Sequence, residues 1–497
     1  MGGAMIHNTQ IRKIVRQYLR SKGLPLHIAV TFPDIFLVDR TSRIKSRSEI
    51  SGSVENLRTQ LTKKTRLNIP IISSNMADVT ESAMAIAIAR KGGLGFIHQF
   101  MPIKDRVSQV REVKRADNEI IENPWCVKPG ISLKEALDFM KLNKTSAVLV
   151  VNDDGVLVGI LTNRDVQFKR YQTDEALKSL RVEDVMTKAL VTANPGITIQ
   201  EAIKILDAKK IEKLPLIDEK NQPVGLITAK DVVKRSQFPM AARDRKGRLL
   251  VGATVGLPDN ILEEVGQLCG AGADAILLDT ARANALRVQE TIQKIKKEFP
   301  KAQLVVGNVD NPEGTRLLID AGADAVKVGI GPGSACKTRE ETGVGMPQLT
   351  AIAECAAVAE DIPIIADGGI AKGGDFAKAL AAGASVVMLG SALAGTDESP
   401  GELQMDKGQK FKVYRGSASL ELQLDRLAKG SLDDIRAPEG EPRRVPYKGS
   451  VGPVIEVLIK NLSSAMSYVN ALTLAELREC QMRWQTRAGH EEGMPKS

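Results

Sequence analysis

The chain has 497 residues and a net charge of +9, from 69 basic and 60 acidic side chains that are interleaved without a long basic run. This balance favours small anions over nucleic acid as partners. Ordinary shares of hydrophobic (43%) and charged (26%) residues exclude a disordered, collagenous or disulfide-dense chain, and the length predicts about two to four domains.

The cysteines and the apolar segments indicate the compartment. No CxxC pair occurs, and the number of cysteines is odd, which argues against a disulfide framework and against a zinc site. The longest wholly apolar stretches, such as 83–89, are much shorter than the roughly 18 residues of a membrane span, and no apolar signal segment follows the first methionine. We therefore expect a soluble, cytoplasmic protein with no membrane partner. The five cysteines are Cys126, Cys269, Cys336, Cys355 and Cys480.

Two short apolar strands are predicted in the first part of the chain. They span 69–76 (IPIISSNM) and 93–98 (GLGFIH), and the segment between them has a helical pattern. The sequence 118–237, further along the chain, has a different pattern of apolar and polar residues.

This second segment contains an internal repeat with a constant offset of 66 residues. PGISLKEALDFM begins at 129 and PGITIQEAIKIL at 195, while GILTNRDV at 159 matches GLITAKDV at 225. Each copy predicts a helix, two strands and a second helix that opens at Asp165 or Asp231. The copies, 118–180 and 181–237, resemble tandem CBS domains. This resemblance implies binding of an adenine or guanine nucleotide, with Thr162, Asp165, Thr228 and Asp231 at the ribose; alternatively, the two aspartates only cap helices.

Six further strands are predicted after residue 238. Three of them follow the signature AGAD or AGAS, in which a glycine ends a helix and a parallel strand begins. With the first two they make eight strand–helix units, which predict an α/β fold: a (β/α)8 TIM barrel formed by 1–117 and 238–497 and interrupted by the repeat. The six strands are expected at 249–256, 273–280, 303–309, 323–331, 363–369 and 384–391.

Candidate functional residues follow these strands, at the barrel end where such folds place their chemistry. Asp367, Gly368 and Gly369 follow the seventh strand, and Gly390 and Ser391 follow the eighth. Backbone N–H groups at these positions commonly bind phosphate, so a phosphorylated substrate is expected. The alternative is that these glycines only form tight turns.

Cys336 is the candidate nucleophile. The loop GIGPGSAC places it at a strand end beside Lys337 and Arg339. Positive charge and backbone N–H groups favour the thiolate, which is the attacking form of cysteine. A buried structural cysteine is the alternative, and it is the interpretation we give to Cys269 and Cys355.

Together these motifs resemble the IMP dehydrogenase / GMP reductase family over about 31–489. The residues that carry the resemblance are GIGPGSACKTRE, ETGVGMPQ, PIIADGG, VVMLGSALAGTDESPGE, YRGSAS and PEG. The inserted CBS pair matches the dehydrogenase arrangement as well.

The resemblance implies a role for each matching residue. Cys336 attacks C2 of a purine 5′-monophosphate and forms a covalent adduct, assisted by Thr338, while Glu439 hydrogen-bonds the base. The substrate-binding set is Ser334, Asn308, Asp367, Gly368, Gly369, Gly390, Ser391, Tyr414 and Gly416, with Asp367 at the ribose. The cofactor, NADPH or NAD, is expected at Asp279, Thr280 and Arg282.

The family pattern also implies a monovalent cation such as potassium. Carbonyls of Gly331, Gly333 and Cys336 would hold it, completed by residues 491–493 of a neighbouring subunit. A homotetramer, or an octamer paired through the CBS domains, is implied on the same ground.

The two branches of the family differ in how the covalent adduct is resolved. Dehydrogenases hydrolyse it with an Arg-Tyr pair on a flap before PEG, but 429–440 of this chain (KGSLDDIRAPEG) contains no Arg-Tyr. We therefore expect GMP reductase activity, GMP and NADPH giving IMP and ammonia. The alternatives are an IMP dehydrogenase, which gives XMP and NADH from IMP, NAD and water, and a non-catalytic purine-nucleotide sensor.

Several departures from the family pattern bear on this choice. Reductases carry a glutamate linked to ammonia chemistry at the position of Leu420. In having leucine there, this chain is like the dehydrogenases. Ala77 replaces the usual aspartate of the motif SSNMADVTE, and Arg282 with Ala283 replaces the usual His-Gly. Arg282 could favour the 2′-phosphate of NADPH or could be a solvated residue, and Lys337 could tune the Cys336 thiolate.

Overall fold

The computed structural model describes residues 8–117, 121–122, 124–143, 145–171, 173–229, 237–428 and 437–493. The chain divides into two compact units. One comprises Met1–Ala116, Met240–Asp244 and Leu249–Ser497, and the other comprises Asp117–Pro239 and Arg245–Arg248.

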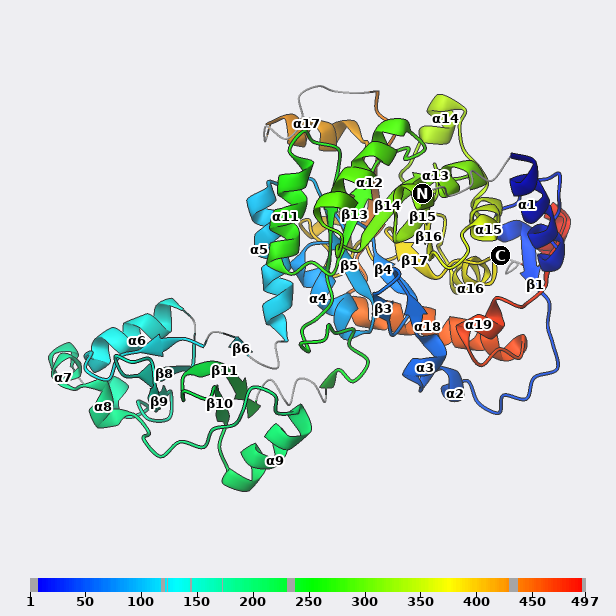
Figure 1. Cartoon of the computed structure of the whole chain (residues 1–497). Coiled ribbons are helices and arrows are strands. Elements are labelled where there is room, and N and C mark those ends of the chain that lie inside the picture. Colours follow the sequence, from blue (N-terminus) through cyan, green and yellow to red (C-terminus); the bar gives the residue numbers. More distant parts are fainter. Residues whose placement is uncertain are drawn as a thin grey trace. The chain divides into compact units, whose positions relative to one another are not determined.

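The first unit is a closed barrel of eight parallel strands, as the sequence predicts. Each predicted strand is present, shortened to its buried core. In barrel order they are β4 (Ile71–Ser73), β5 (Leu94–Ile97), β12 (Gly252–Val255), β13 (Ala275–Asp279), β14 (Leu304–Val309), β15 (Ala325–Val328), β16 (Ile364–Asp367) and β17 (Val386–Leu389), which pairs back with β4 (Figure 1).

A helix follows each strand and covers the outside of the barrel. The AGAD signatures act as predicted: Gly272 and Gly322 end their helices at φ 99° and 111°, a conformation that glycine adopts without strain. These helices are α4 (Ser82–Arg90), α5 (Ile103–Ala116), α11 (Ile261–Ala271), α12 (Leu286–Glu298), α13 (Pro312–Ala321), α15 (Gln348–Val358), α16 (Gly373–Ala381) and α18 (Val451–Tyr468).

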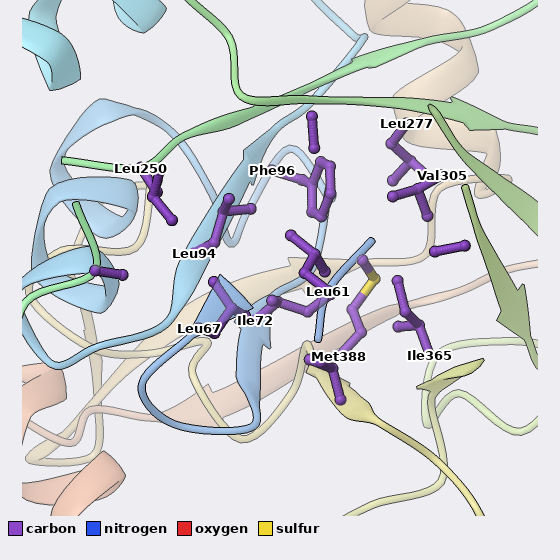
Figure 2. Close-up of a cluster of buried hydrophobic side chains, with 14 residues drawn as sticks. Leu61, Leu67, Ile72, Leu94, Phe96, Leu250, Leu277, Val305, Ile365 and Met388 are labelled. Carbon is purple, nitrogen blue, oxygen red and sulfur yellow. The ribbon is translucent and has the colours of Figure 1, made fainter. Parts of the chain in front are cut away.

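Side chains fill the barrel, so its interior is a core and not a pore. Ile72, Leu277 and Ile365 come from different strands and are fully buried. Leu61, which follows the short β2 (Thr59–Gln60), and Leu67, which ends β3 (Arg66–Leu67), belong to the same cluster (Figure 2). Because the interior is filled, a barrel of this kind carries its chemistry at the C-terminal ends of the strands.

Shorter elements surround the barrel. The amino-terminal helix α1 (Asn8–Lys22) is anchored by the Tyr18 hydroxyl, which donates to the carbonyl of Ala382 at 3.0 Å. Among the described residues, no helix is both long and apolar enough to cross a membrane. The other elements of this unit are β1 (Ile35–Leu37), α2 (Ser48–Ser51), α3 (Val54–Leu57), α14 (Thr338–Thr342), β18 (Gln404–Asp406), β19 (Gln409–Arg415), α17 (Leu420–Ala428), β20 (Pro442–Pro446), α19 (Leu474–Leu477), β21 (Met482–Trp484) and α20 (Arg487–Glu492).

The second unit has two similar halves. In each, a helix that begins with a capping box, at Ser132 or Thr198, precedes two antiparallel strands. The first half contains β7 (Cys126–Val127), α6 (Leu133–Leu142), β8 (Ala147–Val151), β9 (Leu157–Thr162), α7 (Asp174–Ser179) and α8 (Val182–Val185); the second contains α9 (Ile199–Lys209), β10 (Lys213–Ile217) and β11 (Pro223–Thr228), and β6 (Ile121–Glu122) pairs with β11. That this pair is a regulatory CBS module stays a prediction.

One element of this unit was predicted wrongly. No helix begins at Asp165: turns and a short 3-10 helix, Lys169–Tyr171, follow β9 instead. The Asp165 carboxylate accepts hydrogen bonds from the Thr162 hydroxyl at 2.6 Å and from the Thr187 hydroxyl at 2.8 Å, and this holds the segment in a turn. Asp231 lies outside the described residues.

Candidate active site

The loop that carries Cys336, residues 329–336 and called the cysteine loop below, is paired through its backbone with the segment that contains Glu439. Lys337 N–H donates to the Glu439 carbonyl at 2.7 Å, and Glu441 N–H donates to the Ala335 carbonyl at 3.0 Å. Cys336 and Gly440 therefore form an antiparallel bridge. This pairing brings side chains that lie about a hundred positions apart in the sequence to one place.

Three side chains meet there. The Thr338 hydroxyl donates to Glu439 Oε2 at 2.6 Å and lies 3.2 Å from Cys336 Sγ. Cys336 is exposed, so a substrate can reach its sulfur. Such an arrangement can supply a nucleophile and, through the Thr338 hydroxyl, a path for a proton to the Glu439 carboxylate.

The positive charges beside Cys336 have other partners. Lys337 Nζ lies 2.9 Å from Glu441 Oε2, and this carboxylate raises the pKa of Lys337. Arg339 donates to the carbonyl of Ile330, inside the loop, and to that of Met346, in the segment after α14. Both cations therefore brace the loop, a role that the sequence did not predict.

The glycines predicted to bind phosphate lie at the ends of β16 and β17. Gly368 and Gly369 have φ 87° and 77°, so their conformation favours glycine. A Cβ on Gly390 would lie 2.8 Å from the Tyr414 hydroxyl, which places that phenol against the turn after β17. Burial raises the pKa of Tyr414, so its hydroxyl stays a neutral donor.

The remaining residues predicted to bind phosphate also lie at this end of the barrel. Ser334 is exposed in the cysteine loop, and the Ser391 carbonyl accepts from Lys448 Nζ at 2.8 Å. Lys448 was missed by the sequence analysis. In the sequence it is only a single basic residue in VPYKGS, and such a pattern does not indicate a functional residue.

Carboxylates and amides meet across the barrel mouth. Asn308 Nδ2 donates to Asp367 Oδ2 at 3.0 Å, and Asn75 Nδ2 donates to Asp279 Oδ2 at 2.9 Å. Asn308 Oδ1 is buried and has no hydrogen-bond partner among the residues that the structure describes. An unpartnered buried acceptor is costly, so a ligand hydroxyl is the expected donor.

Lys327 joins the two carboxylates and was missed by the sequence analysis. Its Nζ lies 2.9 Å from Asp279 Oδ1 and 2.5 Å from Asp367 Oδ2. The signal was present, because a lysine inside the buried strand pattern ADAVKVGIG requires charged partners.

Asp78 and Arg415 form a second pair that was missed. Arg415 donates from its backbone N–H and its Nε to Asp78 Oδ2, at 2.8 and 2.9 Å, and its NH2 lies 2.8 Å from Asp78 Oδ1. Tyr414 and Gly416 flank Arg415, so this contact ties them to the segment between β4 and α4. Asp78 stands directly after Ala77, where the expected aspartate is absent.

The other predicted positions are placed as follows. The Thr280 hydroxyl donates to the Gly307 carbonyl at 3.3 Å, and Arg282 is exposed in the irregular segment before α12. The Gly333 carbonyl, one of the predicted cation ligands, accepts from Cys336 N–H at 3.1 Å. In the described part of the chain, no group of three or more His, Cys, Asp or Glu side chains is placed to hold a metal ion. Glu491 and Glu492 lie on α20, and Thr228 ends β11.

Gly416 is a sensitive position because it packs against the cysteine loop. A Cβ there would lie 2.7 Å from the Ala335 carbonyl oxygen. We expect Gly416→Ala to displace Cys336 and to lower kcat/KM for the purine nucleotide by about 10- to 100-fold without loss of fold. Gly374→Ala is the control, since no atom lies within 4 Å of its Cβ on α16. Wild-type kcat/KM in Gly416→Ala would contradict the prediction.

Comparison with known proteins identifies the family that this chain matches. The family model described as "IMP dehydrogenase / GMP reductase domain" matches residues 29–496. Inosine-5′-monophosphate dehydrogenase of Aquifex aeolicus is 48% identical over 90% of this chain and 91% of its own length. The enzyme of the same name from Nitrosopumilus maritimus is 44% identical over 94% of this chain and 98% of its own length.

A solved structure is similar over nearly the whole length. It is a GMP reductase from Trypanosoma brucei in complex with guanosine 5′-monophosphate, with a TM-score of 0.85 and 35% identity. The match covers 96% of this chain and 99% of that one.

Proposed function

This chain belongs to the IMP dehydrogenase / GMP reductase family of oxidoreductases, and we propose that it acts as an IMP dehydrogenase, converting IMP, NAD and water to XMP and NADH. The observation that carries the proposal is the near full-length similarity, at 44% to 48% identity, to relatives named for this activity. The reductase activity expected from the flap sequence is the second candidate.

The site residues fit this reaction. The Cys336 thiolate adds to C2 of the purine, and after C2 loses hydride, water displaces the sulfur and gives the oxidised base. Thr338 lies 3.2 Å from the sulfur and donates to Glu439, so this pair is placed to take the proton of the attacking water. Thr338 and Glu439 would thus activate water in place of the Arg-Tyr pair, which the segment 429–440 lacks.

The proposed binding residues follow from the same geometry. Asp367 Oδ1 accepts no protein hydrogen bond among those found in the described ranges, since Lys327 and Asn308 both contact Oδ2. It is therefore available to the ribose hydroxyls of the nucleotide. Gly369, Gly390 and the Tyr414 hydroxyl would bind the phosphate.

The cofactor is proposed to bind beside the purine. Asp279, whose side chain is 17% exposed, ends β13 and is the residue that the family resemblance assigns to the nicotinamide side. When bound, the nicotinamide accepts the hydride. We propose NAD, since relatives are named IMP dehydrogenase.

The second candidate, GMP reductase, rests on two observations. The sequence 429–440 contains no Arg-Tyr, and the chain is 35% identical to the reductase from Trypanosoma brucei. In that reaction Thr338 and Glu439 would protonate the leaving ammonia.

Steady-state assays on the purified protein separate the two activities. IMP with NAD is expected to give a rise in the absorbance of reduced nicotinamide, and GMP with NADPH is expected to give no change. A fall with GMP and NADPH, together with no rise with IMP, would contradict the dehydrogenase and support the reductase. No change in either mixture, with melting temperature raised by either nucleotide, would indicate a non-catalytic binder.

A further inference from the structure

A buried lysine connects the two sides of the candidate active site. Lys327, 2% exposed, lies on β15, while its partners Asp367 and Asp279 end β16 and β13. Since β14 separates β13 from β15 in the barrel, the side chain reaches across a strand to contact Asp279 at 2.9 Å. One ammonium group is thus shared by carboxylates from two different strands.

The charges in this cluster depend on one another. Burial opposes the charged form of Lys327, but the two carboxylates outweigh it and raise its pKa, so the ammonium persists. Each carboxylate is oriented further by an amide, Asn75 on Asp279 and Asn308 on Asp367. Two negative charges and one positive charge are held in a fixed arrangement.

We propose that Lys327 is a positioning residue that couples the two binding sites by serving as the common counter-ion of Asp367 and Asp279. This inference rests on the proposed function, which assigns Asp367 to the purine nucleotide and Asp279 to the nicotinamide cofactor. Lys327 itself acts through these carboxylates. Its role is to balance part of their negative charge and to keep both aimed at their ligands.

Removal of the ammonium should harm both sites together. In Lys327→Met, two partly buried carboxylates lose their common counter-ion and the charged contacts that hold them, so they repel each other and are no longer fixed in place. Loss of a charged hydrogen bond commonly weakens binding by about 10- to 100-fold. We expect the Kd of IMP and the Kd of NAD each to rise by about that factor.

A charge-matched double variant provides the decisive comparison. Lys327→Met with Asp279→Asn has the same net charge in the cluster as the wild type, and Asp367 no longer faces a second carboxylate without a counter-ion. We expect this variant to bind IMP within about 3-fold of wild type, while NAD binding stays weak. The converse pair, Lys327→Met with Asp367→Asn, should recover NAD affinity and not IMP affinity. A lysine that only supported packing would give no such ligand-specific recovery.

The experiment is isothermal titration of IMP and, separately, of NAD into the wild type, Lys327→Met and the two double variants. Melting temperatures are recorded for each variant, and Lys327→Arg tests rescue by a second cation. If Lys327→Met does not fold, the two charge-matched variants carry the comparison. Unchanged affinities in the single variant, loss for one ligand only, or recovery of neither ligand in the double variants would overturn the inference.

Failure of the proposed function would look different. A wild type that binds IMP and NAD without turning them over contradicts the dehydrogenase, yet the affinities of the variants still test the coupling. A wild type that binds GMP and NADPH in place of IMP and NAD moves the same titrations to those ligands. A wild type that binds none of them overturns both proposals.

Discussion

Replacing Cys336 by alanine should reduce turnover by at least about 10⁴-fold, because the reaction then has no nucleophile to carry the covalent step. Nucleotide affinity should change much less, since the proposed phosphate cradle and Asp367 do not depend on the sulfur. The structure supports this separation: Cys336 is exposed at the end of its loop, and the loop is held by backbone hydrogen bonds to the segment around Gly440. Both kcat and the Kd of IMP are measured.

Cys126→Ser is the matched control for this variant. Cys126 is also an exposed free cysteine, but it lies in the inserted unit. We expect this variant to retain wild-type kcat and to form a covalent purine adduct that intact-protein mass spectrometry detects. Turnover within tenfold of wild type in Cys336→Ala, or an adduct on that variant, would rule out Cys336 as the nucleophile.

The barrel was predictable because its signals are local. Each strand is a short apolar run that ends in a glycine or a polar residue, and signatures such as AGAD place a left-handed glycine between a helix and a strand. Eight repeats of one local unit leave few alternatives, and the observed strand order follows the order along the chain.

The interactions inside the site were much less predictable. Thr338 and Glu439 are separated by 101 positions, and only the backbone pairing of two loops brings them together. Arg415 and Asp78 likewise meet across 337 positions. The motifs identified Thr338 and Glu439 as separate candidates. No pattern in the sequence predicted that their side chains form a hydrogen bond.

The lysine at 327 shows a different limit. Its position in the pattern ADAVKVGIG implied a buried charge, yet the sequence could not say which carboxylates neutralise it, since that depends on how far the side chain reaches across β14. The prediction of a helix that begins at Asp165 failed for a related reason. Thr187, a residue from outside the predicted helix, takes the carboxylate that would otherwise cap it.

Glu439→Gln should slow the hydrolytic half of the reaction by about 10²- to 10⁴-fold. The amide can still accept the Thr338 hydrogen bond, so the local geometry is retained, but it cannot take up the proton that water releases. Formation of the Cys336 adduct and loss of hydride precede this step. We therefore expect a rapid burst of NADH equal to the concentration of active sites, followed by a very slow steady state, in stopped-flow measurements with IMP and NAD.

The burst distinguishes a chemical defect from a structural one. A distorted site would lose the burst along with the steady state, whereas loss of a base removes only the second phase. Glu340→Gln is the control, because it removes a nearby exposed carboxylate on α14 that contacts neither Thr338 nor Cys336 through any hydrogen bond found in the described residues. Thr338→Ala should give the same burst, and the double variant should be no slower than either single variant if the two residues act as one relay. Additive losses in the double variant, or a wild-type steady state in Glu439→Gln, would mean that water is activated elsewhere.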